Sequence, residues 1–291
     1  MKRTITLLAA LLLASLAVLH AELPTPQEIS IARQWALSRV FTEDAKLPFS
    51  FTLGGKSSDE LLRTWKRTEA TRELDTQRRE LTRTWMDAAT GLQVRLVATM
   101  YADFPVVEWT VWLKNTGKVN TPILENIQGL DASIERDAAG EFVLHGLRGD
   151  SCVAESYRPY SLKLEPDAVK LCSPPVAGEK VSGKSSDGPD GWPYWNLQKP
   201  GGGVILAVGW PGQWEATFVR DHERGLRAKA GQQLTHLVLK PGEEIRTPSI
   251  TLLFWQGDDV VRAQNLWRSW YLAYVLPRIS GQPQPPILTI H

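Results

Sequence analysis

Cysteine and histidine are scarce in this sequence, and their scarcity excludes several kinds of site. Two cysteines, Cys152 and Cys172, and five histidines are spread over 291 residues. His145, His222 and His236 stand apart from one another and from both cysteines, so no group has the close spacing of metal ligands. We therefore expect no metal and no other cofactor.

Long hydrophobic runs are absent after the N-terminus. Lys2 and Arg3 precede an apolar run at residues 5–19, with small residues at Ala17 and Ala21. This pattern is typical of a secretory signal peptide that is cleaved after Ala17 or Ala21, and the run is too short for a membrane anchor. The sequence thus predicts a secreted or periplasmic protein that has no membrane contact once the signal is removed.

An excess of one charge is also missing. The chain has 33 lysines and arginines against 32 acids, and loss of Lys2 and Arg3 with the signal leaves 31 against 32. A balance near zero favours neither nucleic acid nor anionic lipid as a partner.

The usual catalytic motifs are lacking. No G-x-S-x-G nucleophile motif and no phosphate-binding loop occur, and the glycines at 201–203 precede a strand-like run, as in a hairpin turn. Glycoside hydrolysis needs two carboxylates held about 5–10 Å apart. Asp187 and Asp190 lie on one Gly- and Pro-rich loop, where acids usually form turns. A second set of acids comprises Asp131, Asp150 and Glu155, and nothing in the sequence indicates that they lie together.

The two cysteines leave a disulfide open. Both lie in the exported part of the chain, where a Cys152–Cys172 bridge is permitted and would close a loop of 19 intervening residues. Spacing alone does not show that the two thiols meet, so a disulfide and two free thiols both remain open.

Tryptophan, in contrast, is abundant. The chain has twelve, and such an excess either fills a wide β-core or stacks on sugar rings or bases. The stretch SSDGPDGWPYWNL at 185–197 has the composition of an exposed loop and still carries Trp192, Tyr194 and Trp195. With Asp190 as a polar neighbour, these three form the predicted sugar-binding site. Alternatively, Tyr194 and Trp195 begin the next strand and pack inward.

Hydrophobic periodicity predicts the fold class. A period of two and short apolar runs bounded by Gly and Pro turns predict many strands, with Trp109 and Trp112 on opposite faces of a hairpin. The strand-like segments are 61–85, 92–96, 106–113, 203–210, 213–220, 225–230, 232–240 and 250–255. At 258–274 the period becomes helical, with Asp258 and Asp259 as helix starters and Pro277 beyond the end. The sequence predicts an all-β protein, a large antiparallel sandwich with a C-terminal helix.

Four stretches resemble the N-terminal domain of family 36 glycoside hydrolases, the α-galactosidase-like enzymes. They are FPVVEWTVWLKNTGKVNTPILENIQGLD, SGKSSDGPDGWPYWNL, GGGVILAVGWPGQWEATF, and LKPGEEIRTPSITLLFWQGD followed by VRAQNLWRSWYLAYVLPR. Their order along residues 90–277 and the terminal helix agree with the family. The resemblance implies a β-supersandwich that precedes a (β/α)8 barrel, and it implies that loop aromatics of this domain reach the rim of the sugar site.

The same resemblance implies a domain plan. After the signal peptide that the N-terminal pattern predicts at 1–21, the β-supersandwich spans 22–256, a connecting helix spans 257–277, and 278–291 is a proline-rich linker that would start a truncated barrel. In the family, the catalytic aspartates lie on barrel strands, and no position here matches them. A barrel takes about 200 residues or more, so we expect this chain to be inactive alone and to be either a fragment or a degenerate relative.

The expected function is therefore that of a non-catalytic module of a secreted α-galactosidase-like enzyme, which supports the barrel and contributes aromatic contacts to an α-galactoside. The expected partners are that sugar or a related oligosaccharide, a (β/α)8 catalytic domain and a second copy of the chain. Two alternatives stay open, a free-standing carbohydrate-binding module and a purely structural or oligomerisation domain.

Overall fold

The computed structural model of the chain describes residues 22–42, 46–136, 139–150, 152–173, 186, 188 and 190–284. The chain consists of two compact units. Pro26–Asp258 forms the larger unit, and the described parts of the smaller unit are residues 22–25 and 259–284. The predicted signal peptide and the last residues of the predicted linker lie outside the described residues.

The larger unit is built mainly from strands. Its elements are α2 (Pro26–Ala36), η1 (Leu37–Phe41), β1 (Ser50–Leu53), β2 (Lys56–Ser57), α3 (Ser58–Leu62), β3 (Lys66–Glu73), β4 (Arg78–Met86), β5 (Leu92–Tyr101), β6 (Val106–Asn115), β7 (Leu124–Glu135), β8 (Phe142–Leu147), β9 (Pro159–Leu164), β10 (Val169–Cys172), β11 (Tyr194–Lys199), β12 (Gly202–Gly209), β13 (Trp214–Arg220), β14 (Gly225–Gln232), β15 (His236–Leu237), β16 (Glu244–Arg246) and β17 (Ser249–Gln256).

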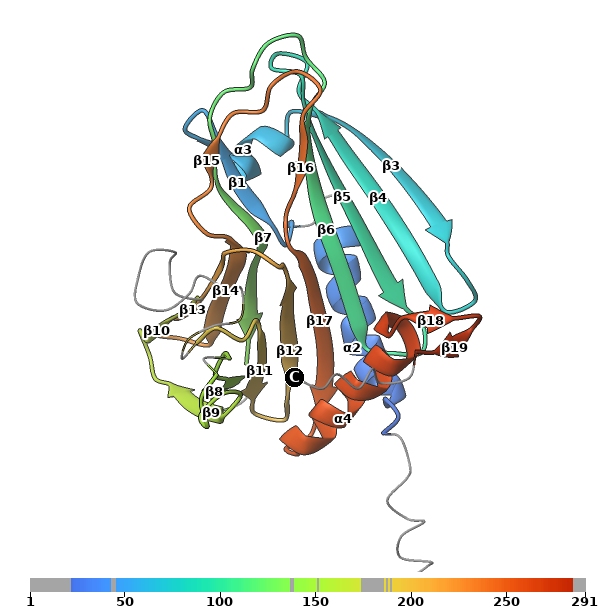
Figure 1. Cartoon of the computed structure of the whole chain (residues 1–291), viewed down its shortest axis with the longest axis vertical. Helices are drawn as coiled ribbons and strands as arrows, with labels where there is room; N and C mark the ends of the chain where they lie inside the picture. The colour runs from blue at the N-terminus through green and yellow to red at the C-terminus, as the bar shows by residue number, and fades with distance from the viewer. Residues whose placement is uncertain are drawn as a thin grey trace, which may run out of the picture. The chain divides into compact units, whose positions relative to one another are not determined.

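Two antiparallel sheets make up this unit (Figure 1). The ten-stranded sheet has the order β3-β4-β5-β6-β17-β12-β11-β8-β9, with β16 also paired to β6. The seven-stranded sheet has the order β10-β13-β14-β7-β1-β2, with β15 also paired to β7. The sandwich predicted from the period-two pattern is thus confirmed.

The core lies between the two sheets, because each strand turns alternate side chains inward. Along β6 the burial alternates, so that Trp109 is buried whereas Trp112, three residues on, lies on the other face. The indole N–H of Trp109 donates to the carbonyl of Gly129 on β7, at 2.8 Å. This bond joins the two sheets through a side chain. The alternating burial along β6 confirms the predicted opposite faces of the two tryptophans.

Helix α2 covers part of the inner face, and the sequence analysis missed it. Its Trp35 stacks on Trp109 of β6, with 5.6 Å between ring centroids, and packs on Phe254 of β17 at the same distance. Glu28, in the first turn of α2, is buried and accepts the backbone N–H of Gln256 at 2.9 Å. Figure 1 shows α2 running along β6 and β17.

Two predicted extended segments need correction. Residues 61–85 do not form strands throughout, because the short helix α3 comes first, and the Ser57 hydroxyl caps it by accepting the N–H of Glu60 at 3.4 Å. In residues 232–240, a single short strand, β15, forms, after Leu234 takes a positive φ of 54° that no strand permits.

The smaller unit contains α4 (Val260–Trp270), the π-helical turn η2 (Tyr271–Val275), and the hairpin strands β18 (Arg278–Ile279) and β19 (Gln282–Pro283). Asp259 is the N-cap of α4, and its carboxylate accepts the N–H groups of Val261 and Arg262. The predicted helix and its start are confirmed. The predicted linker instead begins with a hairpin, which turns at Ser280 and Gly281, both with positive φ.

Across the described residues, no helix is long and apolar enough to cross a membrane.

Candidate functional site

The predicted sugar loop lies beside the connection between β8 and β9. Two backbone hydrogen bonds hold it there. The N–H of Gly149 donates to the carbonyl of Gly188 at 2.8 Å, and the N–H of Asp150 donates to the carbonyl of Ser186 at 2.7 Å. Asp187, which the sequence analysis considered together with Asp190, lies outside the described residues. Two segments that are far apart in sequence thus meet at one end of the ten-stranded sheet.

Trp192 is half-buried and meets an aromatic partner that the sequence analysis did not identify. Tyr157 lies edge-to-face with it, with 5.2 Å between centroids and 87° between planes. The Tyr157 side chain is 48% exposed, so this pair, which we name the aromatic platform, keeps ring surface in contact with solvent.

Tyr157 is held in place by its own loop. Partial burial and a hydrogen bond to the Asp150 carboxylate raise the pKa of the Tyr157 hydroxyl. The same carboxylate accepts the backbone N–H of Cys152 at 2.9 Å and the Ser156 hydroxyl at 3.1 Å. Asp150 thus organises the loop that presents one ring of the platform.

Asp190 is bound to a lysine that the sequence analysis also missed. The Nζ of Lys170 on β10 lies 2.9 Å from the Oδ1 of Asp190, and the same Nζ lies 6.0 Å from the centroid of the Tyr160 ring. The ion pair fixes Asp190 two residues before Trp192. Asp190 is therefore a polar, partly exposed neighbour of the platform.

The prediction for Trp195 is wrong. Its side chain is fully buried and packs edge-on against Trp214, at 5.5 Å between centroids, and against Phe218, at 5.4 Å. A ring without solvent contact offers no face to a sugar, so Trp195 is a core residue. The inward alternative raised by the sequence is correct for this residue.

Tyr194 is the first residue of β11, where it pairs with Ala207 of β12. Its side chain is half-buried, and its backbone N–H donates to the carbonyl of Trp192 at 2.8 Å. Tyr194 and Trp192 are therefore close along the backbone. Whether Tyr194 contacts a sugar stays a prediction.

Neither missed residue had a clear sequence signal. Tyr157 lies in a loop segment without periodicity, and it takes a positive φ of 62°, which only the folded loop determines. Lys170 is an ordinary surface cation until the fold sets β10 beside the loop of Asp190. Both belong to the site through contacts between distant segments.

The other acids are engaged with separate partners. Asp131 accepts two hydrogen bonds from Arg227, at 2.7 and 2.8 Å, and one from the Ser50 hydroxyl at 2.7 Å. The Asp150 carboxylate instead accepts hydrogen bonds within the loop of Tyr157. Asp131 is thus part of an ion pair between neighbouring strands, which is a structural arrangement.

Of the two states left open for the cysteines, the structure has the free thiols. Cys152 is an exposed free thiol, and Cys172 is a buried one. The Sγ of Cys172 lies 3.9 Å from the Tyr160 hydroxyl, and burial raises the pKa of the Cys172 thiol to about 11. Among the described residues, no group of three or more His, Cys, Asp and Glu side chains could hold a metal ion.

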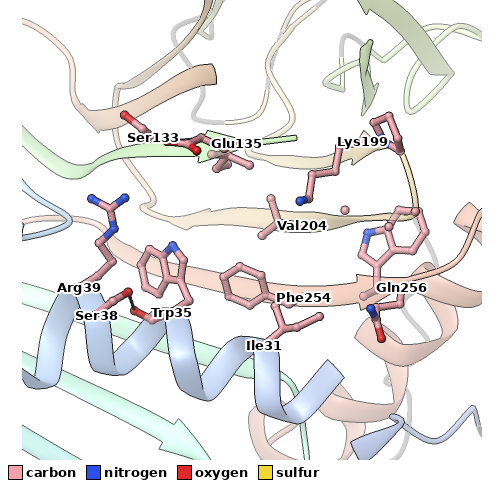
Figure 2. Close-up of a pocket in the computed structure, with 16 residues that line it drawn as sticks. Ile31, Trp35, Ser38, Arg39, Ser133, Glu135, Lys199, Val204, Phe254 and Gln256 are labelled. Carbon is pink, nitrogen blue, oxygen red and sulfur yellow. Dashed lines mark hydrogen bonds between the residues drawn. The ribbon is translucent and has the colours of Figure 1, made fainter. Parts of the chain in front are cut away.

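A concave feature of the larger unit lies away from the predicted site residues. It is a cavity of about 460 Å³ bordered by α2, the end of β7, the turn between β11 and β12, and the end of β17 (Figure 2). Its glycines lie at the predicted hairpin turn, where Pro200 and Gly201 form the turn and Gly202 and Gly203 begin β12. Gly201 has a φ of 75°, as the second central residue of a tight turn requires.

Comparison with known proteins identifies the fold. No family model matches the sequence, and no curated protein does. The α-galactosidase from Lactobacillus brevis superposes with a TM-score of 0.58 at 15% identity, over 78% of this chain and 31% of that chain.

Two structures of the GH36 α-galactosidase AgaA from Geobacillus stearothermophilus also match. A variant in complex with stachyose has a TM-score of 0.53 at 17% identity, over 77% of this chain and 32% of that chain. A variant in complex with raffinose has a TM-score of 0.51 at 18% identity, over 72% and 30%. The chain has the fold of one part of these enzymes and spans about 30% of their length.

Proposed function

We propose that this chain is the non-catalytic N-terminal module of a secreted α-galactosidase-like glycoside hydrolase. Its sandwich supports the catalytic barrel, and its aromatic platform contacts the galactoside. One observation carries the proposal, namely the edge-to-face pair of Tyr157 and Trp192 on a fold shared with part of the GH36 α-galactosidases.

The platform has the chemistry that a sugar requires. An apolar sugar face packs on a flat aromatic ring, while the hydroxyls need polar groups nearby. Trp192 and Tyr157 supply the rings, the Asp150 carboxylate bonds to the Tyr157 hydroxyl, and Asp190 stands two residues before Trp192. Because Lys170 and the loop backbone already fix these acids, little ordering would accompany binding.

The proposed ligand is an α-galactoside. Variants of AgaA, which shares the fold, form complexes with stachyose and raffinose. On this proposal the bond-breaking carboxylates belong to the barrel, and this chain supplies only contacts at the rim of the site. Retaining hydrolysis there would use a carboxylate nucleophile.

The smaller unit has a feature that favours a catalytic domain as partner. Apolar side chains of this unit are exposed to solvent, and those of Val261, Leu272 and Ile279 are more than half exposed. An exposed apolar set of this kind is typical of a surface that another domain covers. We propose the barrel as that domain, and secretion through the N-terminal signal as the route of export.

Binding and turnover measurements test the proposal. Galactose and raffinose are titrated against the wild type, Trp192→Ala and, as a matched control, Trp112→Ala on the outer face of β6. We expect saturable raffinose binding that Trp192→Ala weakens about tenfold and Trp112→Ala leaves unchanged. Turnover of p-nitrophenyl α-galactoside should not exceed the buffer blank.

Two results would contradict the proposal. Enzyme-like turnover by the purified chain would show that the reacting carboxylates are in this module. Equal raffinose affinity in Trp192→Ala and the wild type would remove the platform from the site.

A further inference from the structure

The cavity beside α2 has an apolar wall and floor. Val204 and Phe254, from the two neighbouring strands β12 and β17, are buried at its base, and Ile31 and Trp35 of α2 form one wall (Figure 2). Trp35 is held rigidly, since it stacks on Trp109 and packs against Phe254. A rigid ring is a suitable binding surface because little conformational entropy is lost when a ligand packs on it.

The wall also carries a hydrogen-bond donor. Figure 2 shows the indole nitrogen of Trp35 on the side of the ring that faces the cavity. Among the described residues, this N–H has no acceptor, although Trp109 and Trp255 both donate theirs, to Gly129 and Asn196 respectively. An indole N–H in a concave site usually finds a partner, and a ligand would provide one.

The rim adds polar groups of both kinds. Arg39 contributes a guanidinium, Glu135 a carboxylate, Gln256 an amide and Ser133 a hydroxyl. Within the described part of the chain, none of these four side chains is hydrogen-bonded or ion-paired to another residue. They come from three elements along the cavity, with Arg39 at one end and Gln256 at the other (Figure 2), so an extended polar ligand could bond to all of them.

The mixture of groups selects the class of ligand. An anion would be attracted by Arg39 but repelled by the Glu135 carboxylate. A cation would be attracted by Glu135 but repelled by Arg39 and by Lys199, which also lines the cavity. A hydroxyl donates and accepts, so it pairs with every group on this rim. A molecule with many hydroxyls and an apolar ring face fits both the rim and the wall.

We infer that this cavity binds a neutral oligosaccharide that lies along it. The ring packs on Ile31, Trp35 and Phe254, and the hydroxyls bond to Arg39, Glu135, Gln256 and the Trp35 indole. Its volume of about 460 Å³ lies within the usual range of small-molecule sites. The site is distinct from the aromatic platform and shares no residue with it, so it binds sugar whether or not the platform does.

A titration in the Trp192→Ala background tests this site, because that change removes the proposed platform. Raffinose and digalacturonate are the probes, measured by calorimetry on the whole chain. We expect raffinose to bind the Trp192→Ala chain, with an affinity that added Arg39→Ala or Gln256→Ala lowers by about tenfold. Arg33→Ala, an exposed arginine of α2 outside the cavity, is the matched control and should change nothing.

Each other outcome overturns the inference. Loss of all raffinose binding in Trp192→Ala would leave the cavity without a saccharide. Residual binding that neither Arg39→Ala nor Gln256→Ala weakens would place that sugar elsewhere. Tighter binding of digalacturonate than of raffinose would exclude a neutral ligand. Failure of the platform alone is recognised separately, by equal affinity in Trp192→Ala and the wild type.

Discussion

Arg227 holds Asp131 through two parallel hydrogen bonds, at 2.7 and 2.8 Å, across the neighbouring strands β14 and β7. Burial raises the pKa of the Asp131 carboxyl, but the hydrogen bonds from Arg227 and Ser50 outweigh it, and the net effect lowers the pKa below 3.8. A lowered pKa in the folded state means that the ionised form stabilises the fold. That contribution is present above pH 3.8 and is lost as the pH falls through the lower, folded-state pKa.

Asp131→Asn should therefore lower the free energy of unfolding by about 1–3 kcal/mol at pH 7. The difference from the wild type should shrink as the pH falls below 4. Urea unfolding of both proteins between pH 7 and 3 measures it, with Asp59→Asn, an exposed partner of Arg63, as the control. A difference that stays constant over this range would contradict the assignment.

Trp195→Ala should destabilise the sandwich strongly. Its ring is buried between the sheets against Trp214 and Phe218, and removal of a buried tryptophan leaves a cavity that costs about 3–5 kcal/mol. Trp192→Ala, in a half-buried loop position, should cost about 1 kcal/mol or less. Chemical unfolding of the two variants gives the comparison, and equal losses would disprove the separation of core from platform.

The two cysteines should differ in reactivity. Cys152 is exposed, whereas Cys172 is buried and burial raises the pKa of its thiol to about 11. Iodoacetamide at pH 8 should modify Cys152 in the folded protein and both thiols in denaturant. Mass spectrometry after labelling reads this directly. Absence of labelling in denaturant without reductant would instead reveal a disulfide.

Tyr157→Ala should weaken raffinose binding about as much as Trp192→Ala, because each ring supports the other at 5.2 Å. Tyr157→Phe keeps the ring and loses the hydroxyl that bonds to Asp150, so it should have a smaller effect. Calorimetric titration of both variants separates the ring from the hydroxyl. A larger loss in Tyr157→Phe than in Tyr157→Ala would contradict a stacking role.

The sequence predicted most strands because their side chains alternate with the pleat. Trp109 and Trp112 fell on opposite faces of β6 as expected, and Asp259 caps α4 as its position before an amphipathic run indicated. Helix α2 was not predicted, because its buried residues do not form the apolar stripe of an amphipathic helix; they are Glu28, Ala32 and Ala36.

The site was harder to predict, because it depends on contacts between distant segments. Trp192 and Trp195 are close in sequence and similar in chemistry, yet the start of β11 turns one inward and leaves the other in the loop. Tyr157 joins Trp192 because the β8–β9 connection bonds to the loop through the backbones of Gly149 and Asp150. Local composition contains no information on such a contact.

Fluorine NMR of the chain labelled with 5-fluorotryptophan, titrated with raffinose, tests the central claim most directly. Substitutions assign the signals of Trp192, Trp195 and Trp35. The account predicts that the Trp192 signal shifts saturably while that of the buried Trp195 stays in place, and a shift of Trp35 would report the cavity beside α2. A titration that leaves Trp192 unmoved would contradict the claim that this module contacts the sugar.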